Sequence, residues 1–171
     1  MKELSFTSSA LKENIFSEVS KFITSNGFTI INKDDARPWG GFFVIDEGQS
    51  KKFINTFFSS INADELPGKL SPKFLIVAPG KRLSWQYHFR RAELWKVIGG
   101  EVGVAKSETD SQNPHEKYDT GTLIRLKQGE RHRLIGLDNW GIVAEIWQHT
   151  DKEHPSDEED IIRLQDDFGR N

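Results

Sequence analysis

Short β-rich segments, separated by residues that favour turns, make up residues 74–149 of the chain. Turn-forming pairs such as Pro79-Gly80, Gly99-Gly100 and Asp138-Asn139 interrupt these segments. Regular short strands with such interruptions are typical of antiparallel barrels and sandwiches. We therefore predict an all-β fold, with the polar loop 107–118 between its strands. The expected strands are residues 74–78, 82–88, 94–98, 101–106, 122–126, 131–135 and 142–149.

The N-terminal part of the chain has a helical pattern instead. Apolar residues recur at helical spacing between residues 8 and 26, and Ser25-Asn26-Gly27 favours a helix end. A short strand is expected at 28–31, a second helix at 51–58 and a loop at 62–68. We expect residues 1–36 to form a helical extension packed on a barrel of residues 37–171. The barrel ends in a short helical turn, opened by the capping box Ser156-x-x-Glu159.

Composition narrows the functional classes. A chain of 171 residues fits one domain with a sizeable core, and a net charge of −3 does not favour nucleic acid or an acidic membrane surface. The absence of cysteine excludes disulfides and thiolate ligands. No apolar run approaches the roughly 20 residues of a membrane helix, and the N-terminus lacks a signal-peptide core. We expect a cytoplasmic protein that binds neither nucleic acid nor membranes.

Four residues have the spacing of a metal-ligand set. Gln86 and His88 are two residues apart and would project from one face of a strand; Glu93 and His132 follow. Each has a plainer interpretation on its own, such as a hydrogen-bonded histidine, a surface glutamate or an amide that only supports a ligand. Together, two imidazoles, a carboxylate and an amide oxygen suit zinc, manganese, iron or nickel. We predict that these four residues bind one divalent ion, most simply zinc, with coordination positions left for chemistry.

Two longer motifs contain these residues. The stretches Gly80-x5-Gln86-x-His88-x4-Glu93-x6-Gly100 and Gly121-x5-Lys127-x-Gly129-x2-His132 resemble the two cupin motifs. Gln86 stands where many cupins have a histidine, and Lys127 replaces the usual proline. The resemblance implies a single-domain cupin, which is a double-stranded β-helix or jelly-roll barrel, with an N-terminal helical extension. Cupins are frequently dimers, so the resemblance also allows a homodimer.

Within the cupins, the chain is most similar to the type II phosphomannose isomerases. The similarity extends from Arg37-Pro38-Trp39-Gly40, through residues 79–95 and 129–134, to residues 158–163 and Asp167-Phe168-Gly169-Arg170. It implies a metal-dependent isomerase that interconverts mannose 6-phosphate and fructose 6-phosphate through an enediolate. Arg90 and Leu94 stand where family members often have histidines. The pyrophosphorylase domain that often precedes this module is absent from the sequence.

The implied reaction needs a proton shuttle and cations for the substrate's phosphate. Glu145 is the predicted base; it shares a strand face with Trp147 and His149, and the sequence leaves open which face lines the cavity. Arg133 is the second predicted catalytic residue, and other nearby cations are candidates for phosphate binding. The tryptophans are expected to pack in the core, or alternatively to form the floor of a sugar site. The candidate phosphate-binding cations are Arg90, Arg91 and Lys96. The tryptophans are Trp39, Trp85, Trp95, Trp140 and Trp147.

Two alternative functions fit the same residues. One is a cupin isomerase or epimerase acting on another sugar or sugar phosphate, such as a pentose or heptose phosphate. The other is a metal-bearing cupin that binds sugars without converting them. The small-molecule sugar phosphate is the expected partner in the leading interpretation.

Overall fold

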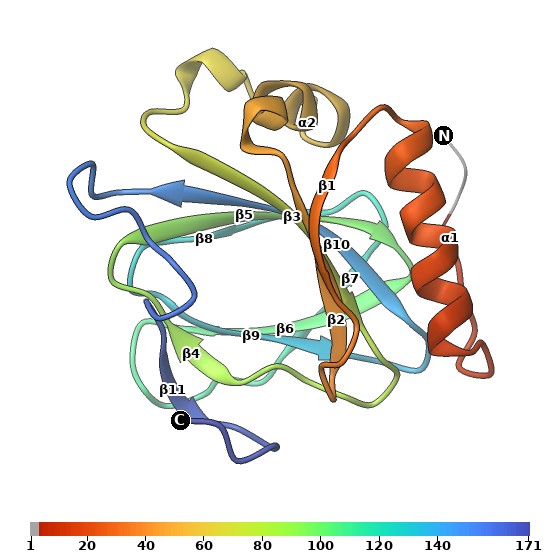
Figure 1. Ribbon diagram of the computed structural model, residues 1–171. Coiled ribbons are helices and arrows are strands. Elements are labelled where there is room, and N and C mark those ends of the chain that lie inside the picture. The colour runs from red at the N-terminus through yellow and green to blue at the C-terminus, as the bar shows by residue number, and fades with distance from the viewer. Residues whose placement is uncertain (1–3) are drawn as a thin grey trace.

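The computed structural model describes residues 4–171 and shows two antiparallel sheets that face each other, with helices on the outside of one of them (Figure 1). The larger sheet has the order β1-β2-β3-β10-β5-β8 and the smaller one β11-β4-β9-β6-β7. The predicted all-β barrel with an N-terminal helix is confirmed. The larger sheet contains β1 (Ile30–Asp34), β2 (Gly40–Ile45), β3 (Leu70–Val77), β5 (Arg91–Gly99), β8 (Leu123–Leu126) and β10 (Gly141–His149). The smaller contains β4 (Trp85–Tyr87), β6 (Glu101–Ser107), β7 (Glu116–Asp119), β9 (Arg131–Gly136) and β11 (Ile162–Gln165).

Helices α1 (Lys12–Ser25) and α2 (Ser50–Phe57) pack on the outer face of the larger sheet. The apolar stripe of α1 is buried, and α2 contributes to a cluster of phenylalanine rings in which Phe53 and Phe74 lie 5.0 Å apart between centroids. The chain leaves α1 through Gly27, whose φ of 79° is readily adopted by glycine. No helix among residues 4–171 is both long and apolar enough to cross a membrane.

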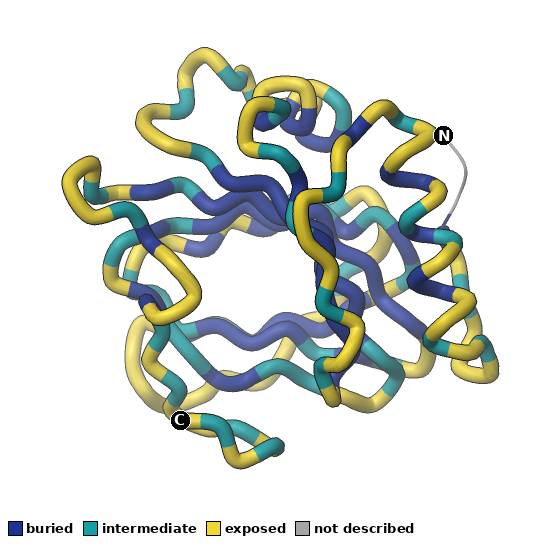
Figure 2. The backbone as a smooth tube through the Cα atoms, viewed as in Figure 1, coloured by how far each residue is buried: buried dark blue, intermediate teal, exposed yellow. Residues whose placement is uncertain are grey.

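The central strands β3 and β10 of the larger sheet are buried on both faces (Figure 2). In β10, Ile142, Ala144 and Ile146 pack toward the helices, whereas Val143 packs in the barrel core. Side chains alternate along a strand, so Glu145 and Trp147 also face the barrel interior, where both line a cavity. A strand buried on both faces is nearly continuously apolar, which explains why the sequence alone left its orientation open.

Several predicted boundaries change. The first helix begins at Lys12 rather than at residue 8, and the strand expected at 82–88 is reduced to β4 plus an isolated bridge between Arg82 and Ile135. Strand β1 lies within the predicted extension but pairs with β2 across the expected boundary at residues 36 and 37. After Ser156 the chain makes a single turn at residues 158–159 without forming a helix, and it then continues into β11, which pairs with β4.

Candidate metal centre

Three of the four predicted ligands meet between the two sheets. Glu93 comes from β5 of the larger sheet, His132 from β9 of the smaller sheet, and His88 from the residue after β4. One ligand atom from each of the three residues lies within 4.8 Å of the others. All three residues are only 2% exposed, so the cluster is held in a largely dry environment.

The two histidines are held so that one ring nitrogen of each can act as a ligand. His88 Nδ1 lies 2.7 Å from the carbonyl oxygen of Asp160, and His132 Nδ1 lies 3.0 Å from that of Glu130. A carbonyl oxygen only accepts, so both Nδ1 atoms carry a proton, and Nε2 is the ring nitrogen of each histidine that can bind a metal. Burial lowers the pKa of His88 to about 3, which keeps its ring neutral at physiological pH.

Glu93 joins the two imidazoles. Its Oε1 lies 3.3 Å from His88 Nε2, and its Oε2 lies 3.5 Å from His132 Nε2. Burial alone would raise the pKa of Glu93, but the charge of Arg91 and the hydrogen bond that Arg91 donates outweigh it, and the pKa is lowered. Glu93 is therefore a carboxylate. Within the described chain, His132 Nε2 is buried without a hydrogen-bond partner. A neutral His88, an ionised carboxylate and an unsatisfied ring nitrogen on His132 fit a divalent ion.

Arg91 also reaches this cluster. Its Nε donates to Glu93 Oε1 at 2.8 Å, one terminal nitrogen lies 3.1 Å from His88 Nε2, and its guanidinium carbon lies 3.6 Å from the centroid of the Trp147 ring. The lone pair of His88 that a metal would use is thus shared with a guanidinium. The sequence suggested Arg91 only as a phosphate ligand. Its alternation with Glu93 along one strand could have indicated this contact.

Gln86 lies beside the cluster rather than in it. It is the register partner of His132 across β4 and β9, and it lines the cavity. Its Oε1 accepts a hydrogen bond from Ser84 Oγ at 2.6 Å. The amide oxygen is therefore already engaged, and the role of Gln86 as a ligand remains a prediction.

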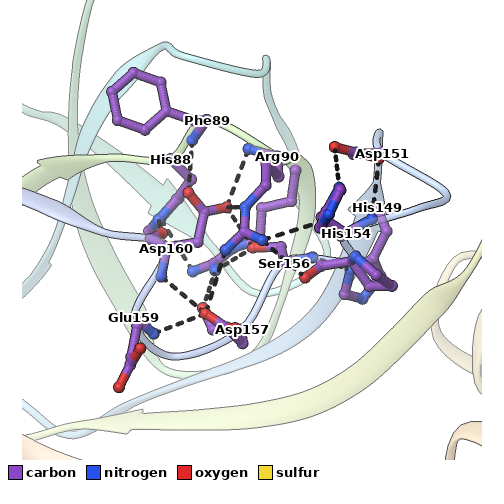
Figure 3. Close-up of polar contacts among 12 residues, drawn as sticks. His88, Phe89, Arg90, His149, Asp151, His154, Ser156, Asp157, Glu159 and Asp160 are labelled. Atoms are coloured by element: carbon purple, nitrogen blue, oxygen red, sulfur yellow. Dashed lines mark hydrogen bonds and ion pairs between the residues drawn. The ribbon is translucent and has the colours of Figure 1, made fainter.

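The loop 150–161 between β10 and β11, which we call the C-terminal loop, braces the His88 segment (Figure 3). The Asp160 carboxylate accepts hydrogen bonds from the backbone N–H groups of Phe89 and Arg90, both at 3.0 Å, and from Ser156 Oγ at 2.6 Å. Burial would raise the pKa of Asp160, but these hydrogen bonds and the charge of Arg90 lower it. The same residue holds His88 through its backbone carbonyl, so one residue fixes both the ring and the strand end beside it.

His149 fixes the start of this loop (Figure 3). Its Nδ1 accepts a hydrogen bond from the backbone N–H of Ser156 at 2.9 Å, so its Nε2 carries the proton and donates to Ser71 Oγ at 2.7 Å. Burial lowers the pKa of His149, and nearby Lys69 lowers it further. The neutral ring is the form that this arrangement requires.

A cavity of about 90 Å³ opens beside Glu93. Glu145 lies in its wall and accepts hydrogen bonds from Trp95 Nε1 at 2.8 Å and Trp147 Nε1 at 2.9 Å. Burial, reinforced by the charge of Glu93, raises the pKa of Glu145 to about 8. Trp39 also lines the cavity, whereas Trp85 and Trp140 do not.

The predicted phosphate-binding cations take different positions. Arg133 is fully buried outside the cavity, where it donates to the Leu83 carbonyl at 2.7 Å and to Gln165 Oε1 at 2.9 Å. Arg90 contacts the C-terminal loop, and Lys96 does not line the cavity. The cations that do line it are Arg37, Lys73, Arg91, Arg163 and Arg170, of which the sequence suggested only Arg91.

Comparisons with known proteins agree with this architecture. The chain is 28% identical over 141 residues to the xanthan biosynthesis protein XanB of Xanthomonas campestris pv. campestris, covering 78% of this chain and 23% of XanB. It is 26% identical over 143 residues to a mannose-1-phosphate guanylyltransferase of Salmonella montevideo, covering 83% and 24%. It is 30% identical over 134 residues to the alginate biosynthesis protein AlgA of Pseudomonas aeruginosa, covering 78% and 22%. The chain thus spans about a quarter of the length of these relatives.

Solved structures show the same fold at low sequence identity. A mutant of Bacillus subtilis oxalate decarboxylase OxdC superposes with a TM-score of 0.55 at 14% identity, covering 78% of this chain and 30% of that one. CapF in complex with 3-isopropenyl-tropolone gives a TM-score of 0.52 at 15% identity, covering 81% and 34%. Residues 28–166 match the family described as "Mannose-6-phosphate isomerase C-terminal". From this match and the barrel itself, we conclude that the chain is a cupin and belongs to the mannose-6-phosphate isomerase C-terminal family.

Proposed function

We propose that this cupin is a metal-dependent sugar-phosphate isomerase that interconverts mannose 6-phosphate and fructose 6-phosphate. The observation that carries the proposal is a pair of carboxylates with opposite environments in one buried site. Glu93 is an ionised carboxylate and forms a possible ligand set with His88 and His132. The pKa of Glu145, in contrast, is raised to about 8. The family match over residues 28–166 supports the choice of sugar.

The chemistry requires a proton to leave the carbon beside a carbonyl and to return to the neighbouring carbon. A divalent ion held by His88, Glu93 and His132 would supply Lewis-acid stabilisation of the substrate oxygens. Glu145 then transfers the proton, because a pKa near the working pH suits a group that must both accept and donate it. Trp95 and Trp147 each donate a hydrogen bond to one carboxyl oxygen of Glu145 and so fix its orientation.

The other predicted catalytic residue, Arg133, has an indirect role in this proposal. Its guanidinium does not line the cavity, but it ties β9 to the Leu83 carbonyl and to Gln165 in β11. Because His132 precedes Arg133 on β9, these bonds hold the strand that carries a metal ligand. Arg133 is thus a positioning residue for the smaller sheet.

Proton NMR of mannose 6-phosphate with metal-loaded protein in heavy water tests the proposal. We expect the C2 proton signal to disappear while fructose 6-phosphate appears, and Glu93→Gln to abolish both changes and reduce bound metal. Chelation should remove the activity, and one divalent ion should restore it. Full turnover by thoroughly metal-free protein, or by Glu93→Gln, would contradict the mechanism.

The same assay separates the alternative substrates. Conversion of a pentose or heptose phosphate, but not of mannose 6-phosphate, would assign a different sugar to the same chemistry. A rise in melting temperature with a sugar phosphate, without proton exchange or product, would instead show a binding protein.

A further inference from the structure

We propose that Arg163, supported by Arg37 and Arg170, forms the subsite that binds the phosphate monoester of the substrate. The sequence alone indicates no role for these three arginines. Arg37 and Arg170 belong to the two outermost motifs, Arg37-Pro38-Trp39-Gly40 and Asp167-Phe168-Gly169-Arg170, which lie more than a hundred residues apart. In the folded chain all three arginines line the same cavity. The inference rests on the proposed function for the identity of the ligand as a sugar phosphate.

The charge of the cavity wall favours an anion. Five cationic side chains line the cavity, against three carboxylates. One of these carboxylates, Glu145, has its pKa raised to about 8, so it is mostly neutral at pH 7. The other two are paired with cations of the same wall, Glu93 with Arg91 at 2.8 Å and Glu158 with Lys73 at 2.5 Å, which leaves the three arginines of the proposed subsite. The wall therefore has an excess of positive charge where a ligand would lie.

Of these cations, Arg163 has the most donor groups free to bind an anion. Arg37 is paired with Asp34 at 2.8 Å and Arg170 with Asp166 at 2.7 Å, but no carboxylate of residues 4–171 lies within ion-pair distance of Arg163. One terminal nitrogen of Arg163 donates to the Asn171 carbonyl at 2.6 Å, and its Nε is buried without a partner. Burial lowers the pKa of Arg163, the charges of Arg170 and Arg37 lower it further, and those of Asp166 and Glu158 oppose the shift.

A second unsatisfied donor lies in the same wall. Trp39 Nε1 is buried and has no acceptor among the described residues, and Trp39 lines the cavity. A buried donor without an acceptor costs free energy unless a ligand or water supplies one. Two such donors, Arg163 Nε and Trp39 Nε1, favour a ligand rich in acceptor oxygens. A phosphate monoester matches this need, and it is the group that guanidinium binds best through paired N–H donors.

The position of Arg163 relative to the metal cluster fits a sugar phosphate. Arg163 is the register partner of Gln86, and Gln86 is the register partner of His132, so the three form one row across β11, β4 and β9. Two interstrand spacings place Arg163 and His132 about 10 Å apart along this row. Figure 1 shows β11 beside β4 at one end of the barrel. This separation suits a ligand whose phosphate lies several carbons from its reacting end.

Arginine Nε–H signals in ¹⁵N-labelled protein test the subsite directly. Inorganic phosphate and mannose 6-phosphate should shift the Arg163 signal, whereas mannose should not. Arg163→Gln should weaken phosphate binding at least about tenfold, because a hydrogen bond to a charged group is lost. Arg163→Lys should restore part of the affinity, since it keeps the charge without the planar fork. The exposed Arg125→Gln on β8 is the matched control and should bind phosphate like the wild type.

The outcomes separate this inference from the proposed reaction. Because phosphate binding requires no turnover, a shifted Arg163 signal without isomerisation would support the subsite and contradict the reaction. Isomerisation of mannose 6-phosphate by Arg163→Gln with an unchanged KM would support the reaction and overturn the subsite. Phosphate binding by Arg163→Gln at wild-type affinity would also overturn it.

Discussion

At the scale of single residues, His132 offers the clearest test of metal binding. Its Nδ1 is held by the Glu130 carbonyl, and its Nε2 is buried without a partner in the described chain. We expect His132→Ala to weaken metal binding by more than the roughly 10–100-fold that loss of a supporting hydrogen bond costs. Calorimetric titration with zinc or manganese measures this change. The exposed His115→Gln is the control, and equal affinities in the two variants would contradict the ligand assignment.

Glu145 tests the proton transfer separately from the metal. Glu145→Gln keeps an oxygen acceptor beside the tryptophans but cannot exchange a proton, so turnover should fall by about 10²–10⁴-fold. Metal content should remain that of the wild type, because Glu145 is not one of the clustered ligands. Steady-state kinetics with metal analysis on the same samples gives both values. Turnover within a few fold of the wild type would remove Glu145 from the mechanism.

At the scale of elements, the C-terminal loop determines how firmly His88 is held. Asp160→Asn keeps the backbone carbonyl that accepts the hydrogen bond from His88. It removes the negative charge of the carboxylate that accepts hydrogen bonds from Phe89, Arg90 and Ser156. We expect a loss of about 1–3 kcal/mol in the free energy of unfolding. We also expect metal affinity to fall by about tenfold or more, because the His88 segment is less firmly held.

Denaturant unfolding and metal titration measure these two effects. Glu159→Gln is the matched control, because Glu159 lies in the same loop and its side chain is exposed. A metal affinity equal to that of the control would show that the loop does not position His88.

The helices and most strands could be predicted because their signals are local. Helix α1 has its apolar stripe, and seven expected strands correspond to β3–β6 and β8–β10. Strand β2 was missed because its residues Gly40–Ile45 are apolar on both faces and show no alternation. Strands β7 and β11 are short and polar, and they form only because β6 and β4 offer open edges. Pairing of that kind is not encoded in the strand itself.

In the candidate site, too, some residues could be predicted from the sequence and others could not. The joint spacing of the two cupin-like motifs predicted that His88, Glu93 and His132 meet, although they lie on or beside three different strands. The contact of Arg91 with the cluster and the arrival of Arg163 at the cavity depend on cross-strand register. Register is set by the whole sheet, and a shift of one residue would move every side chain to the other face. Sequence spacing alone therefore could not identify these cations.

At the scale of the whole molecule, the buried titratable groups predict how stability varies with pH. The pKa of Glu145 is raised to about 8, so above its ordinary value of 4.5 the unfolded chain loses a proton that the folded chain keeps. Stability should therefore fall as pH rises from about 4.5 to about 8. The pKa of His88 is lowered to about 3 from 6.5, so below pH 6.5 the unfolded chain gains a proton that the folded chain does not. Stability should therefore also fall as pH decreases from 6.5 to about 3.

Between pH 6.5 and 8 the Glu145 effect exceeds that of His88, with a slope of at most about 1.4 kcal/mol per pH unit. Urea unfolding of metal-free protein across this range measures it. Glu145→Gln should flatten the slope, whereas the exposed Glu153→Gln should leave it unchanged. An equal slope in Glu145→Gln and the wild type would mean that another group titrates.

The guanidinium of Arg91, which donates to both Glu93 and His88, has a consequence for how the protein matures. The buried carboxylate already has a positive partner, so taking up a divalent ion exchanges one cation for another. Folding and metallation are then separable steps, because Glu93 is already paired with a cation before an ion arrives. A chain folded in the presence of a chelator should take up metal afterwards, at a rate limited by the movement of Arg91 away from His88.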